Sequence, residues 1–150
     1  MKLIDIIDNT PIPFGYRIAF LTNFFREPLL RKMEKQFEII RPEWTVLICL
    51  HFKNGCTAKD ICEITEQPSN TVSRAVTSLA QKKYIERKTD TKDARRSLLY
   101  ITKLGKAFYA DVMGLFVEGE NNLIDCLSDE ERTQLDLILD KMCRHVPDWK

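Results

Sequence analysis

Apolar residues recur at three- and four-residue steps over much of the chain, the spacing that places them on one face of a helix. This spacing predicts a first long helix over residues 14–38 and a second over residues 42–54, in which Pro42 takes the first position. A short third helix follows Thr57, which begins a capping-box sequence, and a fourth covers residues 69–82. The first half of the chain is therefore predicted to be helical.

The pattern changes at Tyr84–Lys88 and Ser97–Thr102, which are short and rich in branched or aromatic residues. These segments flank the polar segment Thr89–Arg96, so they predict a hairpin whose loop is longer than a tight turn. Thr102 has the position of a cap for a long helix that extends from Lys103 to about Cys126. The second half of the chain thus begins with a hairpin followed by a helix.

Both ends of the chain carry apolar residues that need cover. The arm of residues 1–13 ends in Pro11-Ile12-Pro13, which cannot continue a helix, and it carries the apolar Leu3–Ile7 cluster. A capping box at residues 128–131 starts a final helix, which is predicted to place three apolar residues inside, Leu135, Ile138 and Met142. A chain this short buries such surfaces poorly on its own, so we expect a homodimer.

The order of these elements is that of a winged helix-turn-helix, a mainly α fold with a small β-hairpin. The fourth helix would pack against the rest of the domain through Val72, Val76 and Leu79. Its other face carries small polar residues and one arginine, which can enter the major groove of DNA, whereas an ordinary solvated helix face is the alternative. The residues of this helix that we expect to contact double-stranded DNA are Ser69, Asn70, Thr71, Ser73, Arg74 and Thr77.

The predicted wing is basic, with seven Lys or Arg residues between positions 82 and 96. Such a tip can reach a minor groove or its phosphates, and Asp93 is placed to orient Arg95. We therefore expect Lys92, Arg95 and Arg96 to contact DNA. A charged hairpin that only faces solvent is the alternative, and it would be favoured if no polar helix preceded the wing.

The net charge of +1 conceals an uneven distribution. Residues 53–96 carry ten basic and six acidic side chains, whereas residues 97–150 carry six basic and ten acidic ones. The basic middle of the chain suits a surface that faces phosphate, and the acidic end suits solvent or a partner. The length of 150 residues and the hydrophobic content of 44% are those of one folded domain.

Other classes of function find little support in the sequence. No apolar run approaches the roughly 18 residues of a membrane span, no signal peptide is recognisable, and five cysteines without a CxxC pair indicate reduced thiols, so we expect a cytoplasmic protein. Cys56 and Cys62 are interpreted as small buried hydrophobes rather than redox sensors. His51 and His145 lie on separate predicted helices, which does not indicate a shared metal site. With no motif for catalysis or phosphate binding, we expect no enzyme, no cofactor and no metal site.

At the wing the sequence resembles a known family. Asp93-Ala94-Arg95-Arg96, followed by Leu99-Tyr100-Ile101-Thr102-Lys103-Leu104-Gly105, is similar to the D-x-R…L-T-x-x-G signature of the MarR family, the multiple antibiotic resistance regulators. The resemblance extends over residues 14–142, including the Pro42–Leu47 helix opening and the Ser69–Leu79 helix. There are two departures: Ile101 stands where Leu is common, and Lys82-Lys83-Tyr84 stands where the family usually has a glycine before the first wing strand.

The resemblance implies a single domain of residues 1–150, with dimerisation helices at 14–38 and 103–147 and a DNA-binding lobe at 42–102. It implies DNA contact through the outward face of Ser69–Thr77 and through Arg95. The implied function is that of a sequence-specific regulator of transcription, a repressor that binds a near-palindromic operator as a dimer and responds to a small molecule. A winged-helix module that binds an acidic protein partner is the alternative.

The resemblance also suggests an effector pocket where the first, second and long fifth helices converge. An apolar cleft with a few polar tips would suit a small aromatic acid or a phenol, and Arg17 could pair with a carboxylate. The alternative is that these side chains fill the core. The residues expected to line the pocket are Tyr16, Arg17, Phe20, Phe24, Trp44, Ile48, His51, Tyr109 and Met113.

Overall fold

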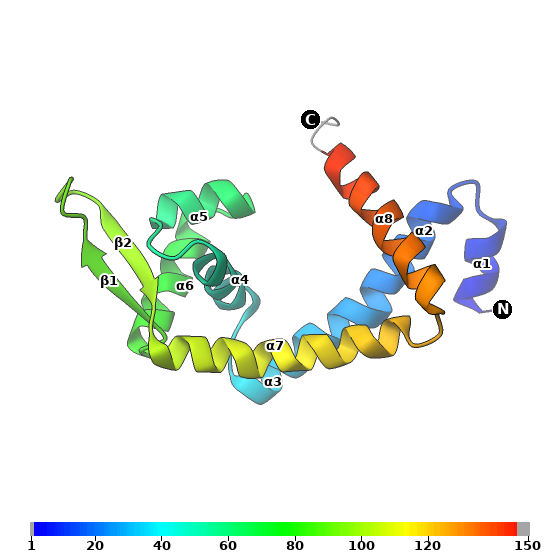
Figure 1. Ribbon diagram of the computed structural model, residues 1–150, viewed down its shortest axis with the longest axis horizontal. Helices are drawn as coiled ribbons and strands as arrows, with labels where there is room; N and C mark the ends of the chain where they lie inside the picture. Colours follow the sequence, from blue (N-terminus) through cyan, green and yellow to red (C-terminus); the bar gives the residue numbers. More distant parts are fainter. Residues whose placement is uncertain (1, 147–150) are drawn as a thin grey trace. The chain divides into compact units, whose positions relative to one another are not determined.

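Helices make up most of the fold, together with one two-stranded antiparallel hairpin, as the computed structural model in Figure 1 shows. The structure describes residues 2–146. Residue contacts divide the chain into two compact units, Met1–Phe116 and Val117–Lys150, and the predicted mainly α class with a small β-hairpin is confirmed. The elements in chain order are α1 (Leu3–Asn9), α2 (Pro13–Leu21), the π-helical turn η1 (Thr22–Arg26), α3 (Glu27–Phe37), α4 (Arg41–Phe52), α5 (Ala58–Thr65), α6 (Ser69–Gln81), β1 (Ile85–Thr89), β2 (Ser97–Ile101), α7 (Lys103–Ile124) and α8 (Asp129–His145).

The arm predicted for residues 1–13 contains the short helix α1. The Lys2 N–H donates to Asp5 Oδ2 at 2.6 Å, which closes the first turn of α1. Helix α1 contacts α2 and buries Ile7, which is 3% exposed. The helix was not predicted; it ends at Asn9, before Pro11, and Pro13 becomes the first residue of α2 because its fixed backbone angle suits that position.

The single helix predicted for residues 14–38 is helical throughout but is interrupted in its middle by η1. There the Glu27 N–H donates to the carbonyl of Thr22, five residues earlier. Pro28 follows, and it has no N–H to donate to Phe24. The regular ladder of hydrogen bonds cannot continue through a proline, and the wider π turn lies at this interruption.

Helices α4, α5 and α6 form the helix-turn-helix at nearly the predicted positions. Helix α4 begins at Arg41, one residue earlier than predicted, so Pro42 is its second residue. The predicted capping box is confirmed, because the Thr57 N–H donates to Asp60 Oδ2 at 2.7 Å and the Asp60 N–H donates to Thr57 Oγ1 at 3.1 Å. Glu66, with a left-handed φ of 55°, ends α5, and α6 begins shortly afterwards.

The predicted hairpin is confirmed. Strands β1 and β2 pair antiparallel, with Ile85 opposite Ile101 and Thr89 opposite Ser97. The loop of residues 90–96 connects them at the end of the hairpin that projects from the lobe in Figure 1. This projecting hairpin is the wing.

The base of the wing is tied to the start of α7. The Thr102 hydroxyl donates to the Lys83 carbonyl at 2.7 Å, and its oxygen accepts from the Gly105 N–H at 3.0 Å, so Thr102 caps α7 as predicted. Lys83 has a left-handed φ of 63°. Lys83 lies in the Lys82-Lys83-Tyr84 segment, where the family resemblance led us to expect a glycine, and a lysine here adopts the conformation that glycine favours.

The core of the first unit draws apolar side chains from α3 to α7 and from both strands. Leu47, Leu50, Ile61, Leu79 and Val112 are completely buried. Burying one such side chain contributes roughly 1.5 to 3 kcal/mol. This core therefore fixes which face of α6 points inward and which face remains available to a partner.

Helix α8 belongs to the second unit and begins at the predicted capping box. The Ser128 N–H donates to Glu131 Oε2 at 2.8 Å, and the Glu131 N–H donates to Ser128 Oγ at 3.2 Å. The prediction that its apolar residues lie inside is wrong for the single chain, because Leu135, Ile138 and Met142 are 37%, 57% and 43% exposed. The helical period identifies the apolar face, but this chain does not cover it.

Candidate nucleic-acid interface

Helix α6 has one buried and one exposed face. Val72, Ala75, Val76 and Leu79 are at most 3% exposed, and the helix contacts α4 and α5. The 3.6-residue period places the predicted DNA-contacting residues on the other side. Among these, the structure leaves Thr71 half-buried and exposes Ser69, Asn70, Ser73, Arg74 and Thr77.

The exposed side chains of α6 differ in their hydrogen bonds. Asn70 Oδ1 accepts from the Thr71 N–H at 2.8 Å, so the amide NH2 group of Asn70 is its outward donor. The side chain of Arg74 forms neither an ion pair nor a hydrogen bond with any residue between 2 and 146. Donors at Asn70 and Arg74 are therefore available to base edges or phosphates.

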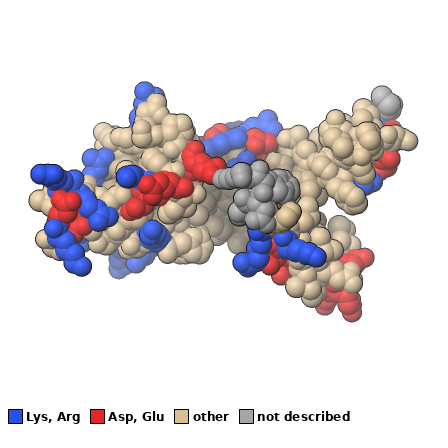
Figure 2. Space-filling view, turned by 90° about the horizontal axis from the view of Figure 1, so that it is seen from above, with Lys and Arg blue, Asp and Glu red and all other residues tan. Residues whose placement is uncertain are grey.

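The wing loop is closed by hydrogen bonds that define its shape. The Asp90 N–H donates to the Arg96 carbonyl and the Arg96 N–H to the Asp93 carbonyl, both at 2.9 Å. Arg96 Nη1 lies 3.7 Å from Asp90 Oδ2, whereas the exposed side chains of Lys92 and Arg95 form no ion pair within the described part of the chain. Figure 2 shows Lys and Arg side chains gathered around this end of the molecule, at the left of the view. The tip thus carries positive charge that the protein itself does not fully balance.

Asp93 contacts Arg95 through the backbone of the arginine. Asp93 Oδ1 accepts from the backbone N–H of Arg95 at 3.0 Å, and it does not pair with the guanidinium. This is the local turn that Asp side chains commonly stabilise. Asp93 therefore holds Arg95 through the backbone that carries it and not through the guanidinium.

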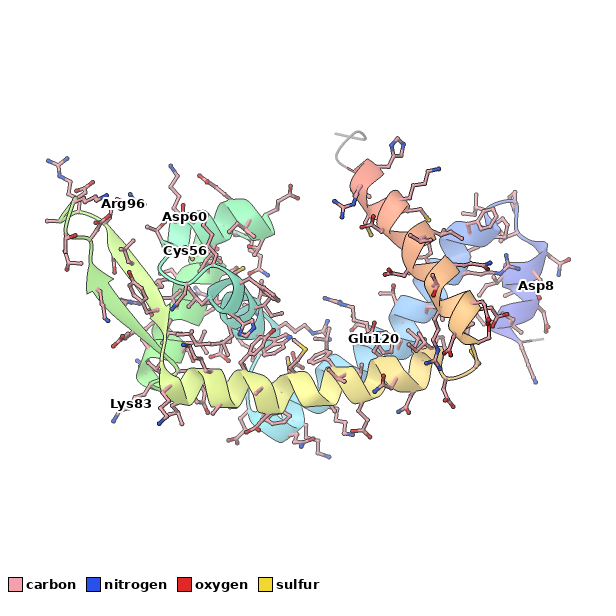
Figure 3. All side chains as sticks on the ribbon, in the orientation of Figure 1. Asp8, Cys56, Asp60, Lys83, Arg96 and Glu120 are labelled. Atoms are coloured by element: carbon pink, nitrogen blue, oxygen red, sulfur yellow. The ribbon has the colours of Figure 1, made fainter. Side chains whose placement is uncertain are left out.

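A polar hollow of about 590 Å³ lies between the start of α5 and the wing. Figure 3 shows Asp60 and Arg96 at this end of the lobe, and Lys83 at the other end of the hairpin. Hydrogen bonds from the backbone and side chain of Thr57 lower the pKa of Asp60, and the charge of Arg96 adds to this effect. The ionised Asp60 balances part of the arginine charge in the hollow. Its lining residues are Thr57, Ala58, Lys59, Asp60, Glu63, Arg95, Arg96 and Ser97.

One basic residue beside α6 was not among the predicted DNA contacts. Arg87 of β1 donates from Nη2 to Thr77 Oγ1 at 3.0 Å. The alternation of side chains along a strand places Arg87 on the same face as the buried Ile85. That alternation was the sequence signal that could have identified Arg87, once the hairpin had been placed against α6.

The residues predicted to line an effector pocket lie in two groups, of which the first belongs to α2 and η1. Tyr16 and Phe20 line a cavity of about 330 Å³ beside α1, and Phe24 stacks on Phe20 with ring centroids 4.5 Å apart. Arg17 Nη2 donates to Asp8 Oδ1 at 2.9 Å, so its carboxylate partner in this structure is an internal one. The other residues around the cavity are Leu3, Ile6, Ile7, Ala19 and Asn23.

The second group lies on α4 and α7 and consists of Trp44, Ile48, His51, Tyr109 and Met113. The Tyr109 ring stacks on Trp44 at 5.1 Å and on His51 at 4.1 Å, and Trp44 also stacks on Phe116 at 5.6 Å. Trp44 and Tyr109 are 5% and 6% exposed, and burial raises the pKa of the Tyr109 hydroxyl. Trp44 and Tyr109 thus belong to the core, as in the alternative interpretation, and Ile48 and Met113 pack against it, whereas His51 is exposed.

The cysteines of the lobe have the environment of structural residues. Cys56 is 3% exposed, Cys62 is half-buried, and burial raises the pKa of the Cys56 thiol, which disfavours a reactive thiolate. Among residues 2–146 there is no cluster of His, Cys, Asp and Glu side chains that could hold a metal ion. Within the same range, no helix has both the length and the apolar character needed to cross a bilayer.

A helix-turn-helix whose second helix presents a polar face, followed by a hairpin with a basic tip, defines a winged helix-turn-helix protein. The MarR family profile matches residues 38–96. The HTH-type transcriptional regulator BilQ of Clostridium symbiosum is 30% identical over 127 residues, which cover 83% of this chain and 88% of BilQ. The chain belongs to the MarR family of transcriptional regulators.

Solved structures agree with this assignment. MepR, a transcription regulator of the Staphylococcus aureus multidrug efflux pump MepA, is 28% identical, with a TM-score of 0.73 over 89% of this chain and 98% of MepR. A MepR–DNA complex from S. aureus is 26% identical, with a TM-score of 0.72 over 92% of this chain and 99% of that one. The relatives named here are thus regulators of transcription, and one of them has been solved on DNA.

Proposed function

We propose that this protein binds double-stranded DNA sequence-specifically and represses transcription. The observation that carries the proposal is the exposed polar face of α6 next to a basic wing. Arg74 on α6 and Arg95 on the wing have no carboxylate partner among the described residues. The DNA complex of the relative MepR supports it. In this proposal α6 enters the major groove, the wing reaches the adjacent minor groove, and the protein acts in the cytoplasm without catalysing a reaction.

A gel-shift experiment with genomic fragments at several salt concentrations tests the proposal. We expect a few fragments to shift at low protein concentration, and the logarithm of the affinity to fall linearly with the logarithm of salt, because bound phosphates release counterions. If no fragment is preferred, the claim of sequence specificity fails. If no DNA binds even at low salt, the alternative that α6 and the wing bind an acidic protein partner replaces the proposal.

We also propose that the protein acts as a homodimer. Leu137, Ile138 and Leu139 of α8 are 66%, 57% and 44% exposed, and apolar surface of this kind on a regular helix is characteristic of an interface. Two lobes in a dimer would place their recognition helices about 34 Å apart, on a near-palindromic operator. Light scattering at micromolar concentration should give the mass of two chains, and Ile138→Glu should shift it to that of one.

We further propose that a small aromatic acid or phenol lowers the affinity for DNA. The cavity beside α1 supports this idea, because Tyr16 and Phe20 provide aromatic walls and Asn23 provides a polar tip. A ligand that lowers the affinity for DNA a hundredfold must bind the conformation with low affinity for DNA more tightly than the conformation with high affinity, by about 2.7 kcal/mol.

A thermal-shift screen of aromatic carboxylates and phenols, repeated with DNA present, tests the ligand response. Phe20→Ala should abolish the shift, whereas Phe24→Ala provides the control, since Phe24 stacks on Phe20 but does not line the cavity. A ligand that stabilises the protein and leaves its affinity for DNA unchanged would refute the switch.

A further inference from the structure

Strand β1 carries three consecutive charged residues, and the hairpin separates them onto two faces. Lys88 Nζ lies 3.1 Å from Glu86 Oε1 and 5.0 Å from the centroid of the Tyr100 ring, so these charges are balanced on one face. Arg87 points to the other face, where α6 lies. Within residues 2–146, Arg87 forms no ion pair. Its charge is therefore available to a partner, although its neighbours in the strand are neutralised.

The contact with Thr77 holds Arg87 beside the exposed face of α6. Arg87 Nη2 donates to Thr77 Oγ1 at 3.0 Å, and both residues are exposed. A guanidinium has five N–H donors in a planar fork, so one contact leaves most of them unused. A side chain already held in one direction loses less conformational entropy when it binds a ligand.

The position of Arg87 determines which part of DNA it can meet. In a winged helix-turn-helix the recognition helix lies in the major groove and the wing reaches the neighbouring minor groove, so one phosphate backbone passes between them. Arg87 lies on the wing strand and contacts the recognition helix, which is the junction between those two elements. Its guanidinium is suited to bind two oxygens of one phosphate.

We propose that Arg87 binds a backbone phosphate of DNA at the junction of α6 and the wing, and that Thr77 is the positioning residue that holds its guanidinium. The inference rests on the proposed DNA-binding function and adds a contact to it. It also changes the role of Thr77, which the sequence analysis placed among the DNA contacts. The Thr77 oxygen accepts from Arg87, and we assign it the support of a phosphate contact rather than the recognition of a base.

Fluorescence anisotropy with a labelled DNA duplex of random sequence tests the proposal without knowledge of the operator. Arg87→Gln should weaken binding roughly tenfold at low salt and reduce the slope of log affinity against log salt by about one for each lobe on the duplex. Lys88→Gln is the matched control, because it removes the same charge from the next residue, and its slope should stay close to that of the wild type.

Two further variants separate phosphate binding from a structural role. Arg87→Lys keeps the charge but loses the fork, so it should retain the salt slope and weaken binding several-fold. Thr77→Val should weaken binding without changing the slope, because the charge remains while its support is lost. A slope for Arg87→Gln equal to that of Lys88→Gln overturns the proposal.

Folding of each variant is checked by thermal melting. If Arg87→Gln does not fold, Arg87→Lys decides, since an affinity equal to that of the wild type overturns the proposal and a several-fold loss at unchanged slope supports it. A wild-type protein that does not bind the duplex at low salt contradicts the DNA-binding function itself. The two failures are therefore distinguishable.

Discussion

The ammonium group of Lys82 lies 3.2 Å from both carboxylate oxygens of Glu43 and donates to the Glu38 carbonyl at 2.9 Å. Glu43 is 2% exposed, and its Oε2 also accepts from the Ile40 N–H at 2.9 Å. Glu38 caps the end of α3, Glu43 lies in the first turn of α4, and Lys82 caps the end of α6. One positive charge thus joins the ends of α3 and α6 to the start of α4.

Removing this charge should destabilise the lobe. We expect Lys82→Met to lower the free energy of unfolding by about 2 kcal/mol, because Glu43 then remains buried without its partner, although partial solvation of the site limits the loss. Urea denaturation measures the change. Lys106→Met, at an exposed position of α7, should cost less than about 0.5 kcal/mol. Equal losses in the two variants would show that the ion pair does not stabilise the lobe.

The left-handed conformation of Lys83 gives a prediction with the opposite sign. A lysine with a φ of 63° is strained, and glycine adopts this region freely. Lys83→Gly should raise the melting temperature and increase the free energy of unfolding by about 0.5 to 1 kcal/mol. Lys106→Gly, in the regular helix α7, should lower the free energy of unfolding by about 1 kcal/mol. If Lys83→Gly destabilises the protein as much as the control does, relief of backbone strain is not the dominant effect.

Two glycines of α7 should respond differently to alanine. A Cβ at Gly105 would overlap the carbonyl oxygen of Tyr84, where the start of the helix packs against the base of the wing, but a Cβ at Gly114 would meet no atom within 4 Å. We expect Gly105→Ala to cost more than about 2 kcal/mol and Gly114→Ala to stabilise by about 0.5 to 1 kcal/mol. Calorimetry of the two variants compares them directly, and a loss of similar size in both contradicts the argument.

The Asp60 capping box should make stability depend on pH. Hydrogen bonds from Thr57 lower the pKa of Asp60 in the folded state, so its contribution is fully present above the unfolded pKa of about 4 and is lost as the pH falls through the lower folded pKa. Asp60→Asn should cost about 1 kcal/mol at pH 7 and progressively less in acid. Asp111→Asn, at an exposed position of α7, is the control. A loss for Asp60→Asn that stays constant from pH 7 to acid would falsify the linkage.

Arg74 and Arg95 should contribute to DNA binding in different ways. Arg74→Ala should weaken specific binding by about 1 to 3 kcal/mol and relax sequence preference, because in the proposed function α6 contacts base edges. Arg95→Ala should weaken binding to all sequences similarly and reduce the salt slope by about one per bound lobe. Affinities for specific and random duplexes test both. If neither variant changes affinity while the fold persists, the assignment of α6 and the wing to the grooves is wrong.

The sequence predicted features whose partners are close together in the chain. The capping boxes at Thr57 and Ser128 are confirmed because each involves residues three positions apart. The Glu43–Lys82 pair joins residues 39 positions apart, and no local pattern indicates which lysine will meet a given buried glutamate. The contact between Arg87 and Thr77 has the same origin, because it depends on the angle at which the hairpin folds back on α6.

The sequence also left the environment of correctly predicted helices undetermined. The period of α8 identified Leu135 and Ile138 as one apolar face, but periodicity does not show whether the chain itself covers that face. For the candidate effector residues, aromatic character alone did not separate Trp44, which is stacked in the core, from Phe20, which lines a cavity. The assignment of these residues to one pocket stays a prediction.

The stacking of Trp44 between Tyr109 and Phe116 has a spectroscopic consequence. A rigid indole held against two other rings gives strong near-ultraviolet dichroism and blue-shifted emission, because its environment is ordered and shielded from water. The chain has one other tryptophan, Trp149, and Trp149→Phe would leave Trp44 as the sole indole. The packing of α4 against α7 would then carry its own optical reporter, so that ligand or DNA titrations could follow this contact without an attached dye.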